Sequence, residues 1–276
     1  MPLEDDAHPL LARIDELIAT DRLDEALELV EETLSAPPED LLDDELAQIE
    51  FEQLALLFEL GEPQRLLDAV QQYDPEDPAA ALFEVRAQLL RWDVERAKER
   101  LRELQDSTER EPGLDADRLE LEALIDDLEG RFDEGDRKLR RAHRRAPEEH
   151  PLPVRLEPEQ AHALLERALS ELPPNIQKSL ENLIVELVPM PRIEPICESG
   201  VTSPWILGLY VGHSALERDA TAPDPLPPRV QIYQRNLERT CADLDDLQEE
   251  LRTTLLHEIG HHLGFDEDGV AELGLE

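Results

Sequence analysis

One stretch near the C-terminal end of the chain gives the strongest constraint on the fold, because apolar residues recur there at the spacing of an α-helix. This spacing predicts one amphipathic helix over residues 243–263. Gly264 follows and predicts its end, since glycine adopts the left-handed conformation of a helix C-cap at little cost. The apolar face of the predicted helix consists of Leu244, Leu247, Leu251, Leu255, Ile259 and Leu263.

The same predicted helix carries an H-E-x-x-H sequence. His257 and His261 are four residues apart, so their imidazoles lie on one face and can bind a single ion. This is the arrangement that holds zinc in H-E-x-x-H peptidases. Glu258 lies about 100° around the helix, where it can reach a water on the metal without being a ligand, as a general base must. His262 points away from this face, so we interpret it as a packing residue or a support for the ligands.

A third metal ligand is expected just beyond the helix. A catalytic zinc ion usually has three protein ligands and one open position for water. A turn at Gly264 would bring the acidic residues that follow it back toward the ion. The spacing H-E-x-x-H-x-x-G-x-x-ligand favours Glu267, with Asp266 and Asp268 as open alternatives. The predicted zinc site therefore consists of His257, His261 and one carboxylate.

At these residues the chain resembles the small bacterial zincin-like metallopeptidases, called minimal metalloproteases, whose motif is H-E-x-x-H-x-x-G-x-x-D. The resemblance implies a zincin fold in which a mixed sheet packs on the metal-binding helix. Two departures are Glu267, where the family usually has Asp, and the absence of a methionine after the motif, so that the Met-turn of metzincins is missing. The similarity covers roughly the last 120 residues and includes residues 172–174, 182–187, 207–212 and 230–233.

Residues 8–146 have helical character throughout and are interrupted by short Pro, Gly or Asp breaks. The second helix of each pair opens alike, as in residues 22–27 and 131–136, at a period of roughly 31 to 40 residues, which brackets the 34 residues of helix-turn-helix solenoids. The segment resembles tetratricopeptide repeats, most clearly at residues 130–134 and 145–148. Four pairs are expected, at residues 10–20 and 23–34, 41–60 and 63–73, 79–91 and 94–104, and 115–130 and 132–146.

The fold class that follows is an α-helical repeat solenoid at residues 1–150, followed by a small α+β zincin-like domain at residues 151–276. Each helix pair leaves an apolar face that only a neighbouring pair can bury, so the pairs stack and form a concave surface. A peptide, a protein partner or the chain's own peptidase domain could occupy that surface, and its acidity favours a basic partner. The expected core residues are Leu27, Val30, Leu54, Leu57, Phe58, Leu82, Val85, Leu89, Leu121, Leu124 and Leu128.

The second domain should contain a strand that holds the substrate. In zincins an edge strand commonly holds the peptide in extended form, and residues 205–212 are our candidate. Tyr210 and His213 would then lie near the site, although a half-buried strand aromatic and a turn histidine are the simpler interpretations. The other expected elements are a linker at residues 149–158, helices at 159–172 and 176–180, and strands at 183–188 and 229–233.

Composition excludes some partners. The 276 residues contain 67 Asp and Glu against 27 Lys and Arg, a net charge of −40, and both halves of the chain are acidic. Nucleic acids and anionic membrane surfaces need cationic patches, so neither is expected as a partner.

The chain is expected to be cytoplasmic. Residues 1–6 are acidic where a secretory signal is basic, and no apolar run reaches the roughly 20 residues of a membrane helix. Cys197 and Cys241 lack metal-ligand spacing, which favours two reduced thiols, while a bridge between them stays open.

These patterns predict a zinc-dependent metallopeptidase with a helical-repeat domain that recruits a substrate or partner. The metal ligands would be His257, His261 and Glu267, Glu258 would be the catalytic base, and Tyr210 would contact the substrate. The alternative is a protein-interaction scaffold whose zinc site is structural or vestigial. A coordination position open to solvent favours the enzyme, and four protein ligands around a buried ion favour the scaffold.

Overall fold

The structure is a computed structural model that describes residues 8–180, 182–193, 203–212 and 227–265. The chain divides into two compact units, Met1–Leu121 and Glu122–Glu276, here called unit 1 and unit 2. This division falls earlier than residue 150, the end of the predicted repeat domain. The predicted boundary between a repeat domain that ends at residue 150 and a zincin-like domain that begins at residue 151 stays a prediction. None of the described helices is long and apolar enough to cross a membrane.

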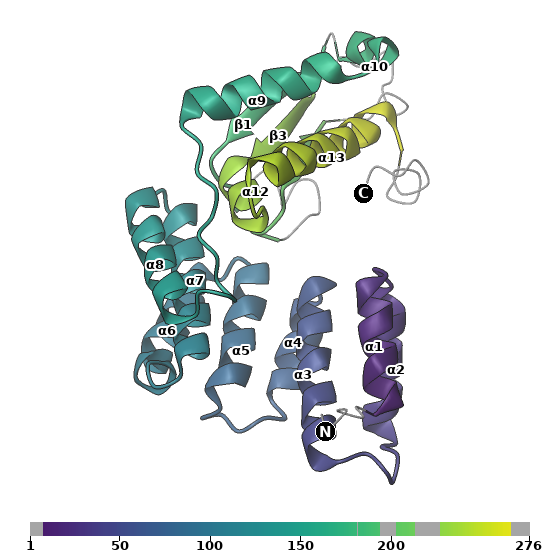
Figure 1. The fold of residues 1–276 in the computed structure, drawn as a ribbon, viewed down its shortest axis with the longest axis vertical. Coiled ribbons are helices and arrows are strands. Elements are labelled where there is room, and N and C mark those ends of the chain that lie inside the picture. Colours follow the sequence, from purple (N-terminus) through teal and green to yellow (C-terminus); the bar gives the residue numbers. More distant parts are fainter. Residues whose placement is uncertain (1–7, 181, 194–202, 213–226, 266–276) are drawn as a thin grey trace, which may run out of the picture. The chain divides into compact units, whose positions relative to one another are not determined.

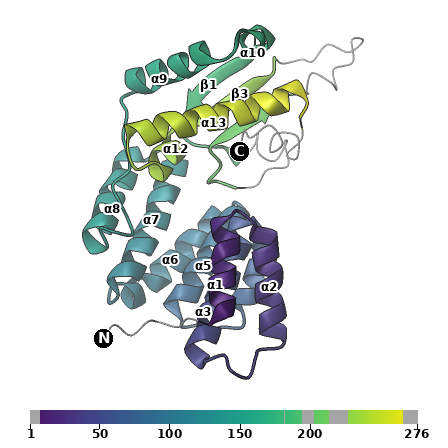
Figure 2. The same cartoon turned by 45° about the vertical axis from the view of Figure 1, so that its right-hand side comes forward.

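Unit 1 is built from consecutive helices, and over residues 9–108 each helix packs against the next (Figure 2). The expected core is confirmed, because Leu27, Val30, Leu54 and Leu57 are buried and Phe58 packs against them half-buried. Whether this helical region is a repeat solenoid stays a prediction. Its helices are α1 (Pro9–Ala19), α2 (Leu23–Ser35), α3 (Asp43–Glu59), α4 (Pro63–Val70), α5 (Pro78–Leu90) and α6 (Val94–Thr108), and α7 (Pro112–Leu128) begins here and ends in unit 2.

The turns within the four helix pairs have the same geometry. In each turn one residue has a positive φ, and the next helix begins two residues later. After α1, the Asp21 amide donates to the Ile18 carbonyl and the Arg22 amide donates to the Leu17 carbonyl, which is the Schellman pattern. The same pair of bonds closes the turns after α3, α5 and α7. The four left-handed residues are Asp21, Gly61, Trp92 and Gly130.

Unit 2 contains a three-stranded sheet of order β1-β3-β2 among the described residues. Strand β1 pairs in parallel with β3 and β2 pairs antiparallel with β3, so the mixed sheet that the resemblance implies is confirmed. Helices α9 and α13 lie side by side along this sheet (Figure 1). The elements are α8 (Phe132–Arg145), α9 (Pro158–Glu171), α10 (Pro174–Ser179), β1 (Ile184–Val188), β2 (Gly208–Val211), β3 (Arg229–Tyr233), α12 (Gln234–Thr240) and α13 (Leu244–Leu263).

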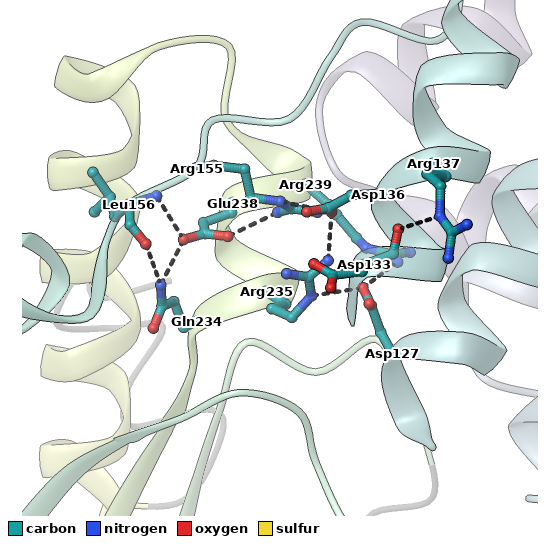
Figure 3. Close-up of polar contacts among 10 residues, drawn as sticks. All are labelled: Asp127, Asp133, Asp136, Arg137, Arg155, Leu156, Gln234, Arg235, Glu238 and Arg239. Carbon is teal, nitrogen blue, oxygen red and sulfur yellow. Dashed lines mark hydrogen bonds and ion pairs between the residues drawn. The ribbon is translucent and has the colours of Figure 1, made fainter. Parts of the chain in front are cut away.

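An ion cluster binds the α7–α8 hairpin to α12, the helix that leads into α13 (Figure 3). The side chain of Asp127 on α7 is fully buried, and its Oδ2 lies 2.8 Å from Arg235 Nε and 2.6 Å from Arg239 Nη2. Asp136 on α8 accepts from Arg235 at 2.6 Å and from Arg155 of the linker at 2.9 Å. These long-range ion pairs explain why α8 belongs to the same compact unit as the sheet.

Glu238 on α12 extends the cluster through Arg155. Its carboxylate is almost fully buried and lies 2.8 Å from Arg155 Nη1. It also accepts from the Leu156 amide at 3.1 Å and from Gln234 Nε2 at 2.7 Å. Burial acts to raise the pKa of Asp136, but the charges of Arg155 and Arg235 outweigh it, so its pKa lies below the ordinary value. Asp136 is therefore held as an anion between two fixed cations.

Asp127→Asn should lower the free energy of unfolding by about 3 kcal/mol, because it removes the buried carboxylate that the Arg235 and Arg239 guanidinium groups share. Urea unfolding of the full chain would measure this loss. Asp133→Asn is the matched control, since Asp133 is exposed on α8 and only its backbone carbonyl is used, by Arg137. The control should change stability by less than about 1 kcal/mol. Equal losses in the two variants would contradict the role of the cluster.

Candidate metal centre

Helix α13 spans Leu244–Leu263, which confirms the helix expected from the apolar spacing. The carboxylate of Asp243 caps its start by accepting from the amides of Asp245 at 2.9 Å and Asp246 at 3.0 Å. Gly264 ends it with φ of 98°, the left-handed conformation expected of a C-cap glycine. Its buried face, which packs on the sheet and on α9, includes Leu247, Leu251, Leu255 and Ile259.

The two motif histidines converge at their ring nitrogens. His257 Nε2 and His261 Nε2 lie 3.0 Å apart, and both side chains are half-buried. A tetrahedral zinc ion with Zn–N bonds of about 2.0–2.1 Å separates two nitrogen ligands by about 3.3 Å. The spacing of the two atoms therefore fits shared coordination of one ion, and the donor set suits zinc.

The turn at Gly264 also orients one of these imidazoles. The Phe265 amide bonds back to the Gly260 carbonyl at 3.1 Å, which places the Phe265 carbonyl 3.1 Å from His261 Nδ1. A carbonyl oxygen can only accept, so Nδ1 carries the proton and donates. In the neutral ring this leaves the lone pair on Nε2, the atom that faces His257.

A second stripe of α13 faces strand β2. A Cβ atom on Gly208 would lie 2.7 Å from Thr254 Cγ2 and 2.9 Å from Glu258 Cγ, so the strand and helix approach closely there. Two residues further along β2, the Tyr210 hydroxyl lies 3.3 Å from His262 Nδ1. Strand residues two apart share a face, and helix residues four apart share a stripe. Strand β2 therefore runs along the side of α13 that carries Glu258.

The Glu258 side chain is buried where α13 packs against the sheet. It is only 7% exposed, and the contact with Gly208 fixes its Cγ. The phenol of Tyr233 is also close: burial raises the pKa of Tyr233, and the charges of Glu258 and Glu186 raise it further, so this phenol stays neutral. A buried carboxylate next to a histidine that can bind a metal is placed to accept a proton from water on that metal.

Several predicted site residues lie outside the described part of the chain. Glu267, Asp266 and Asp268 are among them, so the third ligand stays a prediction, and His213 and Cys197 are outside it as well. Cys241 is a buried free cysteine. Tyr210 is described, and its hydroxyl lies 3.3 Å from His262 Nδ1, while its substrate role stays a prediction.

The sequence interpretation missed the contact of Gly208 with Glu258 and the Tyr210–His262 pair. The available signal was a matching pattern on the two elements. Gly208 and Tyr210 share one strand face, and Thr254, Glu258 and His262 share one helix stripe.

Comparison with known proteins finds a family similarity in the region that carries the candidate metal centre. Residues 180–275 match a family model described as zincin-like metallopeptidase. The matched segment contains the three described strands, α12 and α13, and it ends beyond the predicted third ligand. No curated protein matches the chain. The C-terminal region is thus similar to zincin-like metallopeptidases, and the match does not reach the helices of unit 1.

Gly208→Ala should lower the free energy of unfolding by about 1–3 kcal/mol, because the added Cβ would overlap Thr254 Cγ2 and the Glu258 side chain. Urea unfolding would measure the loss. In a Thr254→Ser background, which lacks Cγ2, the same substitution should cost less by at least about 0.5 kcal/mol. Additive effects of the two substitutions would contradict the packing described here.

Proposed function

We propose that the chain is a zinc-dependent metallopeptidase whose metal ligands are His257, His261 and Glu267. The observation that carries this proposal is the 3.0 Å approach of the two Nε2 atoms on the helix that also carries Glu258. The zincin-like match over residues 180–275 supports the same chemistry. When bound, zinc supplies a Lewis acid for the scissile carbonyl and lowers the pKa of the attacking water toward about 7.

Glu258 is the general base in this proposal. It accepts a proton from the attacking water and then delivers it to the nitrogen of the leaving amine. Its burial beside β2 supports this role, because solvent is largely kept from the carboxylate that carries the proton. The Phe265 carbonyl holds the proton of His261 on Nδ1, so that Nε2 is the ligating atom.

Strand β2 is the proposed platform for the substrate. It pairs with β3 along one side and lies at an edge of the described sheet, so an extended peptide could pair with its other side. Tyr210 on this strand is the proposed substrate contact, and His262 orients its hydroxyl. The helical region before it is proposed to recruit a peptide or protein substrate, in the cytoplasm and without nucleic acid or membrane partners.

The alternative, an interaction scaffold with a structural zinc site, requires an ion enclosed by protein. The half-buried state of both His257 and His261 favours the enzyme, because solvent reaches the face on which the two nitrogens meet.

Glu258→Gln should keep bound zinc and lower peptide hydrolysis by about 10²–10⁴-fold, since it removes the proton acceptor and keeps the shape of the side chain. Metal analysis of the purified chain, followed by digestion of a peptide library with and without chelator, would measure both properties. Glu249→Gln is the control, because Glu249 is exposed on the same helix. A Glu258→Gln variant with full activity, or a zinc-loaded chain that cuts no peptide, would overturn the proposal.

A further inference from the structure

The two imidazoles of the candidate metal centre lie on a stripe of α13 that borders the stripe facing β2. Successive residues of an α-helix are about 100° apart, so His261 lies about 40° around the helix from His257. Thr254 and Glu258, which lie against β2, are about 60° and 100° from His257 in the same direction. The stripe facing β2 is buried, whereas the imidazole stripe is half-buried. The imidazoles therefore stand where the β2 side of the helix meets solvent.

Glu250 is a further side chain on the imidazole stripe. It precedes His257 by seven residues, which places it about 20° from His257 around the helix and about 10 Å nearer the helix start. The residue is half-buried, and its Oε1 accepts from the Thr254 hydroxyl at 3.4 Å. That hydroxyl is the only hydrogen-bond partner of the carboxylate among the described residues, and none of them forms an ion pair with it. Its negative charge therefore lies in line with the metal centre and is not neutralised by a described cation.

Other charged groups at this end of α13 leave that charge in place. Asp246 lies one turn earlier on the stripe, and its carboxylate accepts from the Ala242 amide at 2.7 Å. Arg252, the arginine nearest in sequence, is exposed and lies about 160° around the helix from Glu250. Glu250 is thus the carboxylate nearest to the imidazoles on their own stripe.

The direction of β2 decides which part of a bound peptide lies over Glu250. In the proposed function, on which this inference rests, a substrate peptide pairs with the free side of β2. Gly208 lies against Glu258. Two residues further along the strand, the Tyr210 hydroxyl lies 3.3 Å from His262 Nδ1. Strand β2 and α13 therefore run in the same direction, and the start of β2 is the end nearer Glu250.

The pairing direction of the peptide then sets its polarity. Antiparallel strand pairs are commoner than parallel ones and slightly more stable per residue. A peptide that pairs antiparallel with β2 runs toward Glu250 after its scissile bond. An extended peptide advances about 3.3 Å per residue, so the roughly 10 Å along the helix from His257 to Glu250 corresponds to about three residues.

We propose that Glu250 is a specificity-determining residue that selects substrates with Lys or Arg about three residues after the scissile bond. The ammonium or guanidinium group pairs with the Glu250 carboxylate, which has no other cation among the described residues. An acidic side chain at the same place meets a like charge instead. Glu250 contacts only this side chain and takes no part in breaking the bond.

Charge-scanned peptides would test this selectivity. A peptide that the chain cuts is synthesised with Lys, Ala or Glu in turn at each of the four positions on either side of the scissile bond. Lys about three residues after the bond should raise kcat/KM about fivefold over Ala, and Glu should lower it. Glu250→Gln should remove this difference, and Glu250→Lys should reverse it. Glu249→Gln is the matched control, because Glu249 is exposed about 100° away around the helix and should keep the preference.

Isothermal titration supplies a readout that needs no turnover. With Glu258→Gln present, the Lys peptide should bind about fivefold more tightly than the Glu peptide, and adding Glu250→Gln should abolish the difference. Equal affinities, a charge preference before the scissile bond, or a preference that survives Glu250→Gln would overturn this inference and leave the metallopeptidase proposal standing. A zinc-loaded chain that cuts no peptide would overturn both.

Discussion

The packing of α13 against the sheet and α9 is the interaction on which the rest of the candidate centre depends. Its buried apolar face fixes the rotation of the helix about its own axis, and that rotation decides where every polar side chain points. With Leu255 and Ile259 buried, His257 and His261 project on a half-buried side, and Glu258 turns toward β2. A change of rotation by one residue would move the imidazoles and the carboxylate together and separate them from the strand.

Two further features fix the ends of this arrangement. Gly208 allows β2 to approach α13 at van der Waals distance, so the strand lies directly against the Glu258 side chain. The Asp127 and Asp136 carboxylates hold Arg235 and Arg239 on α12, the segment that precedes α13. Buried ion pairs contribute modest net stability, but breaking one is costly, so such pairs specify position more than they add free energy. The α7–α8 hairpin therefore acts as structural support for the sheet domain.

The sequence predicted the features that depend on local spacing. The limits of α13, the glycine cap and the convergence of His257 and His261 all follow from a 3.6-residue period, and the structure contains them. The ion cluster was beyond reach, because Arg239 and Asp127 are 112 positions apart and 67 acidic residues offer too many possible partners. The turns at Asp21 and Trp92 were equally hidden, since neither residue is the glycine that a left-handed position favours.

Zinc analysis with X-ray absorption at the zinc edge, on the purified full chain, tests the central claim most directly. The proposal predicts one zinc ion per chain, with two imidazole nitrogens at about 2.0–2.1 Å, a carboxylate and one exchangeable oxygen, and loss of that ion in His261→Ala. A chain without stoichiometric zinc, or an ion enclosed by four protein ligands, would contradict it.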